Sequence, residues 1–223
     1  MPITAASLPL RRKLLWGGLF ALSMGYFEAA LVEDLRQLYY PEGFTFPLSD
    51  VPLRMLLIEL GREAASLLML ASVAVLMGSS FIDRFAGFAY GFGVWDISYY
   101  LFLELFEGWP SSPGTTDLLF LIPAPWVGPV WAPLLVSAAL IWAALCIWHR
   151  LDRGLLIRPT RLEWILEIAA GCFIIASFLA GAPTVMRKEM PPAFPWYIWL
   201  TGMALGIGIF LRALHHTEKM ESS

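Results

Sequence analysis

The chain has 223 residues, of which 58% are hydrophobic and only 15% are charged, and its mean hydropathy is +0.67. A soluble domain carries roughly 25% charged residues, so this composition predicts a protein whose main solvent, and first partner, is the lipid bilayer. The net charge of −3 and the absence of a long basic cluster argue against a nucleic-acid partner.

Six apolar segments approach the length of about 20 residues that a helix needs to cross a hydrocarbon core. Stretches rich in proline and glycine separate them, which predicts an all-α fold. We expect one polytopic membrane bundle of about six transmembrane helices, folded as a single domain over residues 1–223. The expected spans are Leu14–Val32, Pro52–Met77, Phe85–Phe106, Val130–Trp148, Trp164–Ala180 and Trp196–Leu214.

The first apolar segment follows Arg11-Arg12-Lys13 and so resembles the start of a secretory signal peptide. It is longer than the 7 to 15 residues typical of the apolar part of such a peptide, and it contains Glu28. We therefore interpret it as a retained first helix.

Lys and Arg are distributed unevenly over the two sides of the six segments. The positive-inside rule places the richer side, which carries both termini, in the cytoplasm of a cell-membrane protein. The ten residues of the richer side are Arg11, Arg12, Lys13, Arg84, Arg150, Arg153, Arg158, Arg161, Arg212 and Lys219. The four of the other side are Arg36, Arg54, Arg187 and Lys188.

An apolar segment broken by prolines, residues 118–129, precedes the fourth expected span. Three prolines and a glycine within seven residues, from Pro123 to Pro129, exclude a regular helix. Irregular backbone survives at membrane depth only where protein or water satisfies its polar groups. Two interpretations stay open: a re-entrant or interfacial segment, or an apolar turn that leads into the next helix.

Ionisable residues within the first three spans are the candidates for function, because each one costs about 2.5 to 3.5 kcal/mol at the centre of a membrane helix. The rise of about 1.5 Å per residue puts them at one depth, between the midplane and the side opposite the termini. Short connections make the three helices neighbours, so these side chains are expected to meet. They are Glu28, Glu59, Arg62, Glu63 and Asp96.

The local spacing favours a shared binding cluster. Arg62 is three residues from Glu59, and Glu63 is four residues from Glu59, so all three lie within about one helical turn. Tyr99 and Tyr100 follow Asp96 by one turn and complete the predicted cluster, since a phenol can donate to a carboxylate. Gly87, Gly91 and Gly93 before Asp96, and Gly61 in the second span, would allow close helix contact or a local kink.

A purely structural interpretation competes with this one. Glu59 and Glu63 could clamp Arg62, with Asp96 bonded to tyrosines, and nothing need react. The mixed charges of Glu33, Asp34 and Arg36 are typical of a solvated helix end.

The candidate cofactors follow from the residue types. No histidine lies inside an expected span, so no haem is expected and any buried metal needs oxygen ligands. A divalent cation could use Glu28, Glu59, Glu63 and Asp96.

Three functions compete at this point. The first is proton- or cation-linked transport, with a small cation as one partner. The second is a membrane-embedded enzyme that uses carboxyl groups as a metal site or as acid and base on a lipid-like substrate. The third is a non-catalytic membrane subunit or assembly factor. The absence of a Glu-x-x-His pair weighs against the usual carboxylate di-iron bundle.

Overall fold

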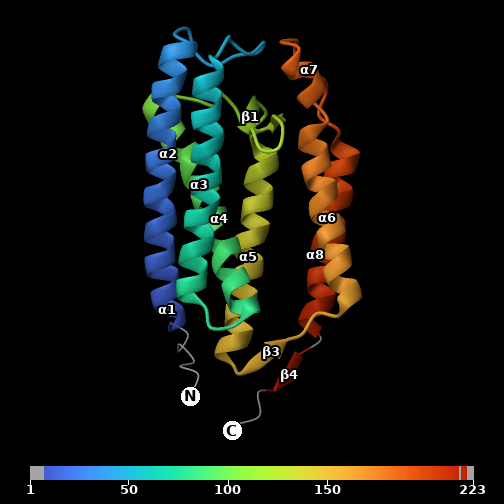
Figure 1. Ribbon diagram of the computed structural model, residues 1–223. Helices are drawn as coiled ribbons and strands as arrows, with labels where there is room; N and C mark the ends of the chain where they lie inside the picture. The colour runs from blue at the N-terminus through green and yellow to red at the C-terminus, as the bar shows by residue number, and fades with distance from the viewer. Residues whose placement is uncertain (1–7, 216, 220–223) are drawn as a thin grey trace.

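The computed structural model describes residues 8–215 and 217–219 and consists mainly of long helices that run side by side (Figure 1). The N-terminal helix is built from α1 (Leu10–Arg12), a π-helical turn (Lys13–Gly17) and α2 (Gly18–Tyr39). The other helices are α3 (Leu53–Met77), α4 (Phe81–Glu107), α5 (Trp131–Asp152), α6 (Arg161–Leu179), α7 (Ala182–Met186) and α8 (Trp196–His215). The strands are β1 (Thr116–Phe120), β2 (Trp126–Pro129), β3 (Leu155–Ile157) and β4 (Thr217–Lys219).

Five helical stretches in the described part of the chain are long and apolar enough to cross a membrane. Large apolar side chains face outward along them, among them Leu68, Leu76 and Ile168, which are 68%, 81% and 64% exposed. The prediction of a multi-pass helical membrane protein is thereby confirmed. The five stretches are Leu10–Tyr39, Leu53–Met77, Trp131–Asp152, Arg161–Met186 and Trp196–His215.

The remaining expected span, Phe85–Phe106, lies within α4, which is not among these five. Helix α4 packs against α2, α3 and α5 and therefore occupies the interior of this part of the bundle. Ten of its residues are buried, and five of these are glycine, serine or aspartate, namely Asp83, Gly87, Gly91, Gly93 and Ser98. Two of these glycines lie against neighbouring helices, Gly87 against Ala74 of α3 and Gly93 against Ser137 of α5.

The ends of the helices follow local rules of chain geometry. The Ser80 hydroxyl accepts a hydrogen bond from the Asp83 N–H at the start of α4, and Gly108 ends that helix in the left-handed conformation at φ +66°. A reciprocal pair of bonds between Thr160 and Glu163 starts α6. These signals place the helix ends within a few residues of those expected from the sequence, except that α2 continues seven residues beyond Val32.

Small residues let the helices approach closely. A Cβ atom on Gly25 would lie 3.0 Å from the Trp95 carbonyl oxygen, so α2 and α4 touch through their backbones. A Cβ on Gly93 would lie 2.6 Å from the Ser137 carbonyl oxygen on α5, and one on Gly202 of α8 would lie 2.8 Å from that of Ala170 on α6. A Cβ atom on Gly61 would meet nothing within 4 Å, so of the two alternatives at that glycine the close contact is not formed.

The proline-rich segment 118–129 forms most of a β-hairpin rather than an irregular loop. Strands β1 and β2 are antiparallel, with Thr116 opposite Pro129 and Asp117 opposite Gly128. Pairing between strands satisfies the backbone polar groups that a broken helix would leave free. The hairpin lies between α3 and α6, at the end of the bundle away from the two termini (Figure 1).

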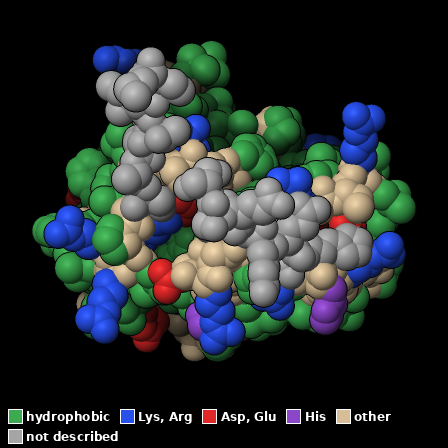
Figure 2. Space-filling model, turned by 90° about the horizontal axis from the view of Figure 1, so that it is seen from below, with side chains coloured by type: hydrophobic (Ala, Val, Ile, Leu, Met, Phe, Trp, Pro, Cys, Tyr) green, Lys and Arg blue, Asp and Glu red, His purple; other side chains and the backbone are tan. Residues whose placement is uncertain are grey.

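The opposite end of the bundle carries both termini and many cationic side chains, which lie around the rim in Figure 2. Arg11, Arg12 and Arg153 are exposed there. Lys13 is different, because it is only 4% exposed and forms an ion pair with Asp83. The Trp148 indole N–H also donates to Asp83, at 2.9 Å. This buried group ties the first helix to α4 and α5.

Candidate functional site

A cavity of about 450 Å³ lies in the half of the bundle away from the termini. Its walls come from α2, α3, α4 and the hairpin, and it is flanked by residues of the α2–α3 connection and of α7. We call it the acidic cavity, because six carboxyl groups line it against three cationic side chains. The carboxyl groups belong to Glu28, Asp50, Glu59, Glu63, Asp96 and Asp117, and the cations are Arg36, Arg62 and Lys188.

All seven residues predicted from the sequence to form one cluster line this cavity. Their helices are neighbours, since α4 packs against both α2 and α3. Helical rise and short connections between the helices predict this grouping from the sequence. The seven are Glu28, Glu59, Arg62, Glu63, Asp96, Tyr99 and Tyr100.

Arg62 joins α2 and α3 through two carboxylates. Its Nε lies 3.0 Å from both oxygens of Glu59, one turn away on the same helix. Its Nη1 lies 2.8 Å from Glu28 Oε1 on α2, and the Ser66 hydroxyl donates to Glu28 Oε2 at 3.1 Å. The expected clamp therefore exists, but Glu28 takes the place that the sequence suggested for Glu63.

Glu63 faces the hairpin instead. Both of its carboxylate oxygens lie 3.0 Å from the backbone N–H of Leu121, which directly follows β1. This N–H is a neutral donor, and within the described residues Glu63 forms no ion pair. Glu63 thus attaches the hairpin to α3 while keeping a carboxylate on the cavity wall.

Asp96 also has a neutral partner rather than a cation. Its Oδ2 accepts a hydrogen bond of 2.8 Å from the Ser137 hydroxyl of α5. The expectation that tyrosines would hold Asp96 is wrong, because Tyr100 donates to Asp117 at 3.0 Å. The cause is geometric: the hairpin brings a second carboxylate to the phenol.

A second ion cluster, centred on Arg36, was missed by the sequence analysis. Arg36 is 6% exposed and pairs with Glu107 and, at 3.3 Å, with Asp117, which is 1% exposed. Its guanidinium carbon lies 3.9 Å from the centre of the Trp109 ring and 4.6 Å from that of Phe44. Such stacking and pairing are typical of a buried arginine, so the expectation of a solvated helix end at Arg36 is wrong.

Aromatic side chains of α4 and of the segment that follows it pack around this cluster. Trp109 stacks on Tyr100 at 6.3 Å, and Tyr100 contacts Tyr99 edge-on at 5.0 Å. Trp95 packs on Phe120 of the hairpin at 6.1 Å. Trp95, Tyr99 and Tyr100 line the acidic cavity, and Trp109 packs against Tyr100 outside its lining.

The carboxyl groups do not form a metal site. In the part of the chain that the structure describes, no group of three or more His, Cys, Asp or Glu side chains is close enough together to hold a metal ion. Glu28 and Glu59 are engaged by Arg62, while Glu63 and Asp96 bind donors on different elements. The divalent-cation site suggested for Glu28, Glu59, Glu63 and Asp96 thus gains no support.

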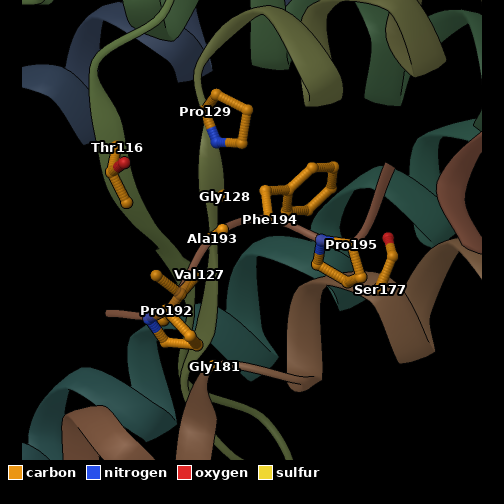
Figure 3. Close-up of a pocket in the computed structure, with 10 residues that line it drawn as sticks. All are labelled: Thr116, Val127, Gly128, Pro129, Ser177, Gly181, Pro192, Ala193, Phe194 and Pro195. Carbon is orange, nitrogen blue, oxygen red and sulfur yellow. The ribbon is translucent and has the colours of Figure 1, made fainter. Parts of the chain in front are cut away.

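A smaller cavity of about 30 Å³ lies between the hairpin and the segment that leads into α8 (Figure 3). Figure 3 shows Phe194 beside Gly128 and Pro129, and Pro195 next to Ser177 of α6. Its size suits about one water molecule, and its walls are mostly apolar. It carries no group of residues suited to chemistry.

The carboxyl group of Asp117 lies in β1, outside the helices that can span the membrane. Burial raises its pKa from 3.8 to about 6, against the opposing effects of Arg36 and of the Tyr100 hydrogen bond. Between these two values the folded chain binds more protons than the unfolded chain, so stability falls as pH rises through this window.

We expect the melting temperature of the detergent-solubilised protein to fall with rising pH because Asp117 loses this proton. The wild type should lose more stability than Asp117→Asn when the pH rises from about 4 to about 7, because only the aspartate must give up a proton there. Thermal unfolding of both proteins at a series of pH values measures the difference. A gap between them that stays constant with pH would contradict the raised pKa.

The fold and the acidic cavity define a class: a multi-pass helical membrane protein with ionisable side chains gathered in one cavity. No family model matches the chain, and no significantly similar protein was found among curated proteins or solved structures. The site itself must therefore carry any conclusion about function.

Proposed function

We propose that the protein transports a small solute across the cell membrane, coupled to protons carried by acidic side chains of the acidic cavity. One observation carries this proposal. Glu63 and Asp96 line a cavity large enough for a small molecule, and each is held by a neutral donor rather than by a cation. A carboxylate in this position can take up and release a proton without breaking an ion pair.

The topology that goes with this proposal has six spans: the five stretches named above and, in addition, α4. Helix α4 has 27 residues, which exceeds the length that a membrane helix requires, and its neighbours shield much of it from lipid. The cationic end seen in Figure 2 would face the cytoplasm with both termini, and the acidic cavity would face the other side. The whole chain would form one domain, with the hairpin as an interfacial or re-entrant segment beside the cavity.

Glu63 provides a physical link between protonation and structure. A carboxylate accepts a stronger hydrogen bond than a neutral carboxyl group, so protonation weakens the bond from the Leu121 N–H. The hairpin that this bond holds also carries Asp117 and Phe120, both of which line the cavity. Proton binding at α3 would thereby loosen one wall of the solute site.

Proton movement in proteoliposomes tests the proposal. The purified protein is reconstituted with a pH-sensitive dye inside, and a panel of amino acids, monocarboxylates, sugars and alkylammonium ions is added outside. We expect at least one class to drive proton movement, and we expect Glu63→Gln or Asp96→Asn to slow it by roughly tenfold or more, since neither amide can carry the proton.

Glu167→Gln is the matched control. Glu167 is a carboxyl residue of α6 that does not line the acidic cavity, so its replacement should leave the proton movement unchanged. The proposal fails if wild-type vesicles behave like protein-free vesicles for every class in the panel, or if Glu167→Gln slows the movement as much as Glu63→Gln does.

A further inference from the structure

The cations that line the acidic cavity are all engaged by carboxylates of the protein. Arg62 is held by Glu28 and Glu59, and Arg36 by Glu107 and Asp117. Lys188 pairs with Asp50. The two arginines thus pair with four carboxylates. The carboxyl groups of Glu63 and Asp96 are additional, and each accepts a hydrogen bond from a neutral donor. The cavity has an excess of negative charge that something from outside must balance.

The charged neighbours of the two remaining carboxyl groups reinforce this excess. Arg62, Glu59 and Glu28 act on Glu63, while Asp117 and Glu28 act on Asp96. Arg36 lines the cavity as well, but it is bound by its own two carboxylates. Around Asp96, therefore, these charged neighbours are acidic, and around Glu63 they are acidic except for Arg62, which Glu28 and Glu59 share.

Aromatic rings from several elements share the cavity wall with these carboxyl groups. They come from the first helix, the α2–α3 connection, α4 and the hairpin. The negative face of an aromatic ring attracts a cation within about 6 Å of its centre. The rings include those of Tyr39, Phe44, Trp95, Tyr99, Tyr100 and Phe120.

Trp95 adds an unpartnered polar group to this wall. Its side chain is only 3% exposed, and its indole N–H has no hydrogen-bond partner among the described residues. A buried donor without a partner costs roughly 1 to 3 kcal/mol.

The size and lining of the cavity indicate what kind of cation fits. A volume of about 450 Å³ is within the range of sites for small organic molecules and far exceeds what one bare metal ion fills. Apolar side chains such as Val32, Met55 and Leu118 complete the lining. The site therefore suits a charged group joined to an apolar body.

We infer that the solute is an organic cation with an apolar or aromatic body, and that it exchanges with the protons of Glu63 and Asp96. This inference rests on the proposed transport function, because it names the substrate class of the same cavity. Binding of the cation supplies the missing positive charge, and binding of protons removes the need for it. The two ligands thus compete for one set of carboxyl groups.

A series of three small probes tests the charge preference. Benzyltrimethylammonium, benzyl alcohol and benzoate share an aromatic ring and differ in charge. Isothermal titration of the full chain in lipid nanodiscs, with empty nanodiscs as the blank, should show binding of the cation only. We expect the affinity for the cation to fall by about tenfold or more between pH 8 and pH 5, and by about tenfold in Glu63→Gln or Asp96→Asn, because each change removes a nearby negative charge.

The pH series uses the wild type alone, so it tests the inference even if a substitution impairs folding. Glu167→Gln should bind the cation as the wild type does. The inference is overturned if benzoate or benzyl alcohol binds as tightly as the cation, or if neither pH nor the two substitutions change the affinity for the cation.

The same probe separates this inference from the proposed function. If benzyltrimethylammonium binds as expected but neither it nor any solute class of the panel moves protons in proteoliposomes, the cation site stands and proton-linked transport falls. If another solute class drives proton movement while the cation fails to bind, transport stands and the organic-cation inference falls.

Discussion

Replacing Arg36 with methionine is expected to destabilise the protein by about 3 to 5 kcal/mol, which is the cost of breaking a buried ion pair. Arg36 is 6% exposed, and its loss leaves Asp117, at 1% exposure, without its cation. Methionine fills similar space between Phe44 and Trp109, so lost packing contributes little. Thermal or chemical unfolding in detergent measures the effect.

Two further variants identify the cause. Arg54→Met removes an exposed arginine of α3 and should change stability by less than about 0.5 kcal/mol. Asp117→Asn, combined with Arg36→Met, removes the stranded charge and should recover a large part of the loss, because Glu107 remains 21% exposed and can reach water. Equal stability of Arg36→Met and Arg54→Met would contradict a buried arginine.

The second large effect is expected at Arg62. Arg62→Met leaves Glu28 and Glu59 facing each other without the guanidinium that lies between them. We expect a loss of about 3 kcal/mol, at the lower end of the range for buried pairs because the Arg62 side chain is 18% exposed. Unfolding in detergent again measures it, with Arg54→Met as the control on the same helix.

Arg62→Lys sharpens this prediction. Lysine keeps the charge but offers no planar fork, so it cannot hold Glu59 through two bonds while also reaching Glu28. Its stability should lie between that of the wild type and that of Arg62→Met. A lysine variant as unstable as the methionine variant would indicate that packing, rather than charge, gives Arg62 its role.

Much of the fold follows directly from the sequence. Apolar runs of about 20 residues can only be helices in lipid, and this constraint placed the long helices within a few residues of their observed ranges, except at the end of α2. The grouping of Glu28, Glu59, Arg62, Glu63 and Asp96 followed from helical rise and from short connections between neighbours. Both arguments use one helix at a time and need no long-range information.

The features of the site that the sequence did not predict depend on contacts between distant segments of the chain. Asp117 lies at the start of an apolar stretch, and only the pairing of β1 with β2 brings it to Arg36, 81 residues away. Glu63 turned away from Arg62 because the hairpin presents the Leu121 N–H to it. One signal was available: a lone acidic residue directly before the apolar run Leu118–Ile122 is unusual unless it is buried with a partner.

Labelling of single cysteines tests the central claim most directly, namely that Glu63 lies in a water-filled cavity that opens away from the termini. In a background with Cys146 and Cys172 replaced by serine, Glu63→Cys and Glu167→Cys are treated with a membrane-impermeant cationic thiosulfonate from either side of sealed vesicles. We predict that Glu63→Cys reacts only from the side opposite the termini and that Glu167→Cys reacts from neither side. Failure of Glu63→Cys to react, or its reaction from the side that carries the termini, would contradict the account.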